Sequence, residues 1–92
     1  MKIIVVFKGL LAEWMGVARA EFDLPEPARY SDLLRAIARA YRSNMPPQLW
    51  REETDGFATP VAALVDGLRL VEGETPLADG QEVMFFLVIT GG

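Results

Sequence analysis

The sequence contains no cysteine and no histidine. Without cysteine, the chain can form no disulfide, no thiolate nucleophile and no cysteine-ligated zinc or iron–sulfur centre. Without histidine, it lacks the side chain that most often performs acid–base catalysis and binds metals near neutral pH. We therefore expect no metal site, no bound cofactor and no catalytic side chain of its own.

Positive charge and long apolar runs are also scarce. The net charge is −4, and no cluster of lysine and arginine supplies the basic stripe that nucleic acid requires. The apolar run that follows Met1 and Lys2 is too short for a signal peptide or a membrane span. We expect a cytoplasmic protein that binds neither nucleic acid nor membranes.

The chain does contain enough apolar material for one core. Of its 92 residues 51% are hydrophobic and 24% are charged, which is typical of a folded globular protein. A chain of this length supports a single core. We expect one domain over residues 1–92, with a flexible tail at residues 90–92.

Apolar patterning predicts the strands of a sheet. Residues 3–7 and 83–89 are apolar throughout, which is typical of central strands buried on both faces. Residues 18–24 alternate between apolar and charged, as in a strand with one solvated face. Residues 61–65 form a short apolar run, and Asp66-Gly67 then predicts a tight hairpin into a further strand at residues 68–71. A second tight turn is expected at Asp79-Gly80.

One substantial helix is predicted. It begins at Ser31, a favourable N-cap, and Asp32 lies in the first turn, where the helix dipole favours negative charge. Its apolar stripe comprises Leu34, Ile37, Ala38 and Tyr41.

A shorter helical turn is expected at residues 10–15. Gly16 would close it as the C-terminal cap. Its inward side chains would be Leu11, Trp14 and Met15.

Residues 43–59 carry no clear pattern and are predicted to be a loop with one short helix. The whole order of elements predicts an α+β fold of the β-grasp type: a mixed sheet of four to five strands, with the first and last side by side and one main helix on one face. Both faces of the last strand are apolar. Either one set of its side chains meets a partner, or residues 43–59, with Trp50 and Phe57, cover the second face.

The segment from Pro76 to Phe86, followed by the terminal Gly91-Gly92, resembles the ending of the MoaD/ThiS family of ubiquitin-like sulfur carriers. The resemblance covers nearly the whole chain except residues 43–59, and the length is most similar to the small subunit of molybdopterin synthase. Two positions differ from the family pattern. Gln81 stands where an acidic residue is common, and Leu87-Val88 stand where prolines are common.

The resemblance implies that the functional group is the carboxylate of Gly92. An E1-like adenylyltransferase would adenylate it with ATP, a sulfur donor protein would convert it to a thiocarboxylate, and the larger catalytic subunit of molybdopterin synthase would receive the sulfur. Thr90 and Gly91 would be the part of the tail that the partner binds. The tail would thread a narrow channel, where a Cβ at Gly91 or Gly92 would clash with the walls. The expected docking residues next to the tail are Phe85, Phe86, Leu87 and Val88.

Three alternatives remain open at this point. The chain could carry sulfur for thiazole and thiamine or for another pathway, or it could be a ubiquitin-like modifier joined to lysines of other proteins. In a different class, it could be a plain protein-interaction module with an idle tail.

Overall fold

The computed structural model describes residues 1–41, 50–51, 56–57, 61–67, 69–70 and 73–88. Two helices and nine strands occur in the described part of the chain. In order they are β1 Lys2–Phe7, α1 Leu10–Met15, β2 Arg19–Asp23, β3 Ala28–Arg29, α2 Tyr30–Ala40, β4 Trp50–Arg51, β5 Gly56–Phe57, β6 Val61–Val65, β7 Arg69–Leu70, β8 Pro76–Leu77 and β9 Glu82–Leu87.

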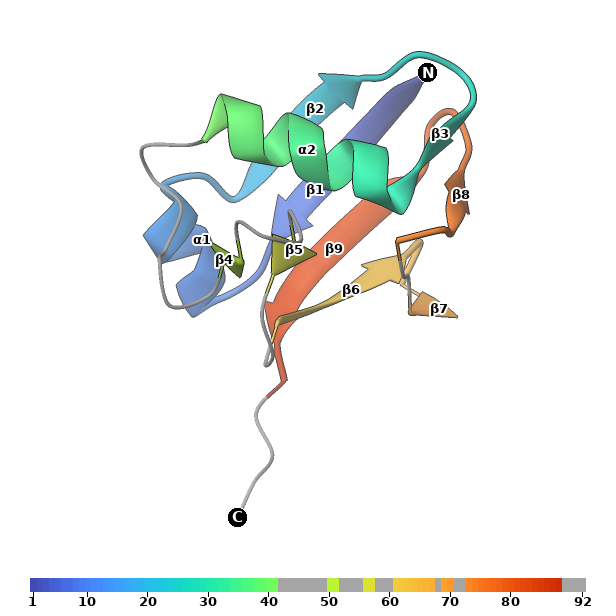
Figure 1. The fold of residues 1–92 in the computed structure, drawn as a ribbon. Helices are drawn as coiled ribbons and strands as arrows, with labels where there is room; N and C mark the ends of the chain where they lie inside the picture. Colours follow the sequence, from blue (N-terminus) through green and yellow to red (C-terminus); the bar gives the residue numbers. More distant parts are fainter. Residues whose placement is uncertain (42–49, 52–55, 58–60, 68, 71–72, 89–92) are drawn as a thin grey trace.

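The main sheet has five strands in the order β2-β1-β9-β6-β7 (Figure 1). The first and last strands lie side by side at its centre and are parallel, with Val5 opposite Val83 and Phe7 opposite Phe85. The neighbouring pairs β1–β2 and β6–β9 are antiparallel. The predicted mixed sheet, with the two doubly apolar strands adjacent, is therefore confirmed.

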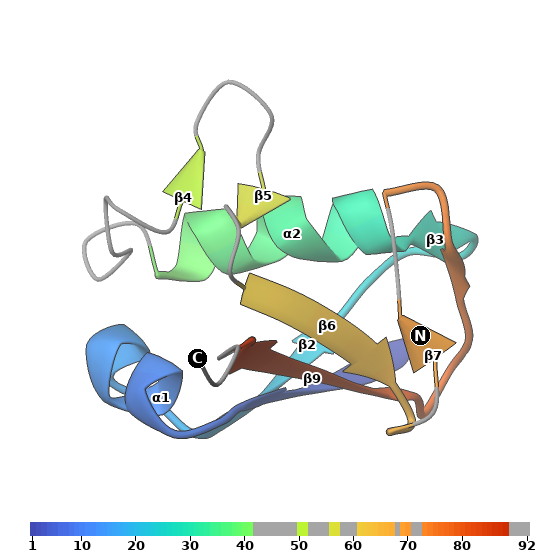
Figure 2. The same cartoon turned by 90° about the horizontal axis from the view of Figure 1, so that it is seen from below.

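Helix α2 crosses one face of the sheet, and the core lies between these two layers (Figure 2). Ile37 and Leu33 on the helix are fully buried, as are Val5 and Phe85 on the sheet. Leu33 belongs to this buried face although the predicted stripe omitted it. Among the described residues, no helix covers the opposite face of the sheet, which we call the open face.

The start of α2 differs from the prediction by one residue, because Ser31 is not the N-cap. The helix begins at Tyr30, with Arg29 as the cap. The amides of Tyr30 and Ser31 donate to the carbonyls of Thr75 and Gly73, at 2.9 and 3.0 Å. The segment before β8 thus satisfies the first two amides of the helix, which have no partner within it.

Helix α1 confirms two parts of its prediction and contradicts a third. Gly16 caps it in the left-handed conformation with φ 78°, and its amide donates to the carbonyl of Ala12. Leu11 and Met15 are fully buried, whereas Trp14 is 39% exposed. Residues four apart lie on the same side of a helix, and a helix this short turns only one side to the core. Leu11 and Met15 occupy that side, so Trp14 lies on another.

Residues 43–59 contain a structure that the sequence did not predict. Strands β4 and β5 pair antiparallel, with Trp50 opposite Phe57, so part of this segment is a hairpin. The predicted short helix would fall on residues 42–49, 52–55 or 58–60, which lie outside the described residues. The ring of Phe57 packs on Phe85 with centroids 5.2 Å apart. The hairpin therefore lies on the helix side of the sheet and not over the open face (Figure 2).

Two turns form where predicted. Asp66 and Gly67 both have positive φ, 52° and 70°, in the turn that joins β6 to β7. Val65 pairs with Arg69, so three positions separate the paired residues and not the predicted two. The predicted strand after this turn is described at Arg69–Leu70, while positions 68 and 71 lie outside the described residues. Gly80, in the turn before β9, has φ 85°.

Candidate functional site

The predicted reactive end of the chain, Thr90, Gly91 and Gly92, lies outside the described residues. The structure instead shows the base from which this tail departs. Strand β9 ends at Leu87, and Val88, which follows it, is 45% exposed. The described part of the site is therefore its supporting strand, β9.

Strand β9 is held from both sides along its length. It pairs with β1 from Glu82 to Phe85 and with β6 from Val83 to Leu87. Beyond the β1 ladder, the amide of Lys8 donates to the carbonyl of Phe85 at 3.0 Å. A strand paired on both edges cannot shift its register without breaking two ladders. The point at which the tail begins is thereby fixed relative to the sheet.

The turn that feeds β9 is tied to the first strand. The amide of Lys2 donates to Asp79 Oδ1 at 2.6 Å, and the amide of Gly80 donates to the carbonyl of Lys2 at 2.7 Å. The side chain of Gln81 accepts a hydrogen bond from the amide of Ala78 at 2.7 Å. A glutamate carboxylate could accept the same bond, so the departure from the family pattern at Gln81 preserves the turn.

The four predicted docking residues do not share one surface. Phe85 is fully buried and stacks on Phe7, with ring centroids 5.5 Å apart, so it belongs to the core and its inclusion in the docking set was wrong. Side chains alternate along a strand, which places Phe86 on the open face. Leu87 is half-buried beside the core and Val88 is exposed.

The open face carries a continuous row of half-buried apolar side chains. Register places Val6 beside Met84, Met84 beside Leu64, and Phe86 beside Ala62. We call this row the open-face stripe; its members are Ile4, Val6, Ala62, Leu64, Met84 and Phe86. An uncovered apolar row of this kind is typical of a protein-binding surface.

Charged side chains of β2 border the open-face stripe. Arg19, Glu21 and Asp23 are exposed on this outer strand. Glu21 pairs with Lys2 at 3.7 Å, with both side chains about half exposed. Such exposed pairs contribute little stability, so their effect is to make the rim polar.

Two ionisable groups among the described residues have shifted pKa values, Tyr30 and Asp32. Burial raises the pKa of Tyr30, whose ring stacks on Phe85, so its hydroxyl stays protonated. The pKa of Asp32 is lowered, first by the backbone amide of Arg29 and then by the Arg35 side chain. No group of three or more acidic residues within the described ranges could hold a metal ion.

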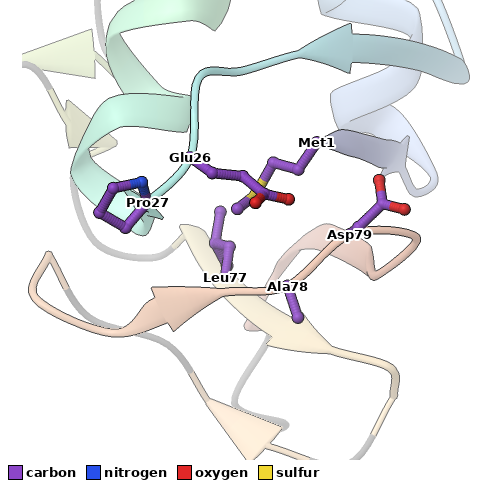
Figure 3. A pocket seen from close by; sticks show the side chains of 6 residues that line it. All are labelled: Met1, Glu26, Pro27, Leu77, Ala78 and Asp79. Carbon is purple, nitrogen blue, oxygen red and sulfur yellow. The ribbon is translucent and has the colours of Figure 1, made fainter.

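A separate cavity of about 460 Å3 opens beside the N-terminus (Figure 3). It lies at the end of the sheet where β1 begins, away from the end of β9 (Figure 1). Its lining residues are Met1, Glu26, Pro27, Leu77, Ala78 and Asp79. The ammonium of Met1 is already engaged with the carbonyl of Leu24 at 2.7 Å, and Asp79 holds the amide of Lys2. These polar groups therefore serve the fold.

No helix in the described part of the chain is long and apolar enough to cross a membrane.

The mixed sheet with parallel first and last strands, crossed by one helix, defines the β-grasp fold of ubiquitin-like proteins. Solved structures with this fold match almost the whole chain. SAMP1 from Haloferax volcanii has a TM-score of 0.83 and 20% identity, with 100% of each chain covered. A protein described as molybdopterin converting factor, subunit 1, from Pyrococcus furiosus has a TM-score of 0.74 and 26% identity, covering 97% of this chain and 99% of its own.

Small archaeal modifier protein 1 from Methanosarcina acetivorans is also similar, with a TM-score of 0.69 and 18% identity over 99% of this chain and 96% of its own. No family model matches the chain, and a search of curated proteins finds no match. At 18–20% identity the two modifier proteins bear on the fold alone. The predicted resemblance to ubiquitin-like proteins of the β-grasp fold is confirmed by these neighbours.

Proposed function

We propose that this chain is a ubiquitin-like sulfur carrier whose reacting group is the C-terminal carboxylate of Gly92. The observation that carries the proposal is the position of β9. This strand is paired on both edges at the centre of the sheet, and it leads directly into Thr90-Gly91-Gly92. The fold thus supplies a rigid base for a tail whose last two residues have no side chain.

The chemistry of the tail requires external activation. A C-terminal carboxylate has a pKa of about 3.3–3.7 and is a poorly electrophilic anion at neutral pH. An E1-like adenylyltransferase would join it to the AMP part of ATP and release pyrophosphate. A persulfide on a donor protein would then attack the acyl carbon and displace AMP, which gives an acyl disulfide. Attack by a thiol of the donor protein would break that disulfide, release the thiocarboxylate on Gly92 and leave a disulfide on the donor. This chain binds no cofactor in the scheme, since ATP belongs to the activating enzyme.

The length of the tail suits this role. The residues from Ile89 to Gly92 span at most roughly 13–14 Å, at about 3.3–3.6 Å per residue. That distance takes Gly92 into a partner's active site while the globular body stays at the entrance. Glycine at the last two positions adds no Cβ to the width of the chain.

Among sulfur pathways, we propose molybdopterin synthesis, with this chain as the small subunit of the synthase. The similar protein from Pyrococcus furiosus is described as a molybdopterin converting factor subunit, and the two chains match over nearly their full lengths at 26% identity. The larger catalytic subunit would accept the tail and consume the sulfur. The open-face stripe, with Phe86 at its tail end and Val88 beyond it, would then contact that subunit.

A second candidate, a protein modifier, is favoured by the similar structures that carry the name small archaeal modifier protein. In that case the amine of a lysine on another protein would attack the adenylated Gly92, releasing AMP and forming an isopeptide bond. The first step is shared with the sulfur carrier. The two functions differ only in the nucleophile that follows.

Intact-mass analysis of the protein from its native cells tests the proposal. Replacement of one terminal oxygen by sulfur is expected for a carrier, and lysine-linked adducts are expected for a modifier. Deletion of Gly92 should abolish both species, while Ala78→Ser, at the exposed turn before β9, should preserve them. Absence of both species from sulfur-replete cells would refute the proposal. A Gly92 deletion that retains biological function would instead favour a plain interaction module.

A further inference from the structure

Exposed large apolar side chains gather at one end of the molecule. Within the described residues they are Leu10, Trp14 and Val88, with 50%, 39% and 45% of their surface exposed. Leu10 and Trp14 lie four residues apart, on the outer side of α1, and α1 packs beside β9. Val88 follows the end of β9 directly. Figures 1 and 2 show α1 at the end of the sheet where β9 finishes.

One of these side chains, Leu10, lines a small hollow. A cavity of about 200 Å3 is lined by Lys8, Gly9 and Leu10 from the β1–α1 junction and by Phe86 and Leu87 from β9. Its lining is mostly apolar apart from Lys8. A hollow of this size accepts about one aliphatic or aromatic side chain.

The rim of the hollow carries one positive charge. Lys8 is exposed, and no carboxylate of the described residues pairs with it, whereas Lys2 at the other end pairs with Glu21. Glu13 on α1 is the nearest acidic residue in sequence and forms no ion pair there. An apolar hollow beside an unpaired ammonium fits a partner that offers an apolar side chain next to a carboxylate.

We propose that Lys8, Leu10 and Trp14 form a docking surface for the enzyme that adenylates Gly92, and that this surface adjoins the open-face stripe at Phe86. The inference rests on the proposed function and names the contact that this enzyme makes. The tail from Ile89 to Gly92 reaches at most roughly 13–14 Å. An enzyme that holds the Gly92 carboxylate must therefore approach the end of the sheet that carries these three side chains.

The test measures ATP–pyrophosphate exchange by the purified E1-like enzyme encoded in the same genome, as a function of carrier concentration. Leu10→Asp and Lys8→Glu should each raise the KM for the carrier by about tenfold or more and leave kcat within about twofold, the pattern of lost docking at an interface hot spot. Ala78→Asp and Arg39→Glu, exposed changes of matching charge away from this end, should leave KM unchanged. Urea unfolding of each variant checks that the fold is intact.

The outcomes separate the two levels of the proposal. If the wild-type chain supports no exchange, the proposed function fails, and the docking assignment fails with it. If the wild type supports exchange but Leu10→Asp behaves like Ala78→Asp, the docking assignment alone is overturned. It is also overturned if the wild type sediments as a dimer that Leu10→Asp disperses without a change in KM, since the surface then binds a second copy.

Discussion

Substitution of Phe85 by alanine tests the assignment of that ring to the core. The side chain is fully buried, and its ring contacts those of Phe7, Tyr30 and Phe57 at centroid distances of 5.5, 6.0 and 5.2 Å. Loss of a buried phenylalanine side chain costs about 3–5 kcal/mol. This is a large part of the about 5–15 kcal/mol that stabilises a typical domain.

The assay is equilibrium urea unfolding followed by tryptophan fluorescence. With an m-value of about 1–2 kcal/mol/M, typical of a small domain, Phe85→Ala should lower the midpoint by about 1.5–5 M. If this variant does not fold, Phe85→Leu provides a milder change. It removes three aromatic ring pairs, each contributing about 0.5–1.5 kcal/mol, and leaves an apolar side chain in place.

The neighbouring residue is the matched control. Phe86 lies on the open face and is half-buried, so Phe86→Ala should cost clearly less stability than Phe85→Ala. Equal costs for the two variants, or a cost below about 1 kcal/mol for Phe85→Ala, would refute the assignment of the two strand faces.

Three further predictions concern the fold. Leu33→Ala removes a fully buried side chain that the predicted stripe omitted, and it should lower the free energy of unfolding by about 2–5 kcal/mol in the same assay. Gly80→Ala places a Cβ at φ 85° and should cost about 1–2 kcal/mol in chemical denaturation, although no atom lies in its way. The pKa of Asp32 is lower in the folded state than in the unfolded chain, so its contribution is present above the unfolded pKa of about 3.9 and lost as the pH falls through the folded value. Asp32→Asn should therefore reduce stability at pH 7 and flatten the decline of the urea midpoint below about pH 4; an unchanged profile would contradict the assignment.

Strand patterning predicted the sheet because the physical cause is local. The apolar runs at β1 and β9 do form central strands, each bordered by a strand on both sides. One set of their side chains is buried in the core, while the other set is half-buried on the open face, so the predicted burial of both faces was wrong for the second face. Asp66-Gly67 adopts positive φ values in the turn between β6 and β7, and these residue types tolerate them. Each of these inferences depends on a few adjacent residues.

The errors came from contacts between distant segments. Ser31 is a good N-cap by type, but carbonyls of Gly73 and Thr75 bind the first amides of α2, and local sequence does not encode that contact. The β4–β5 hairpin depends on packing of Phe57 against Phe85, across 28 positions of the chain. Phe85 was placed among docking residues because its neighbours are apolar too. Only the position of α2 over one face decides which side of β9 is buried.

The candidate site was predictable in its chemistry and not in its surroundings. The terminal glycines and the turn before β9 are visible in the sequence. The surface formed by Lys8, Leu10 and Trp14 was missed, because Trp14 was assigned to the core. A sequence signal existed, since Leu10 and Trp14 occur four apart on a helix whose other side already holds Leu11 and Met15.

The pairing of β1 with β9 makes folding depend on synthesis through residue 87. Until residues 82–87 have left the ribosome, the nascent protein lacks the middle of its sheet. Chains cut short before this point retain only two-stranded ribbons on either side of a gap, and such ribbons are marginally stable in water. Prematurely terminated copies would therefore be cleared by proteases as unfolded chains. The molecules that survive are those read through to the strand that bears the tail.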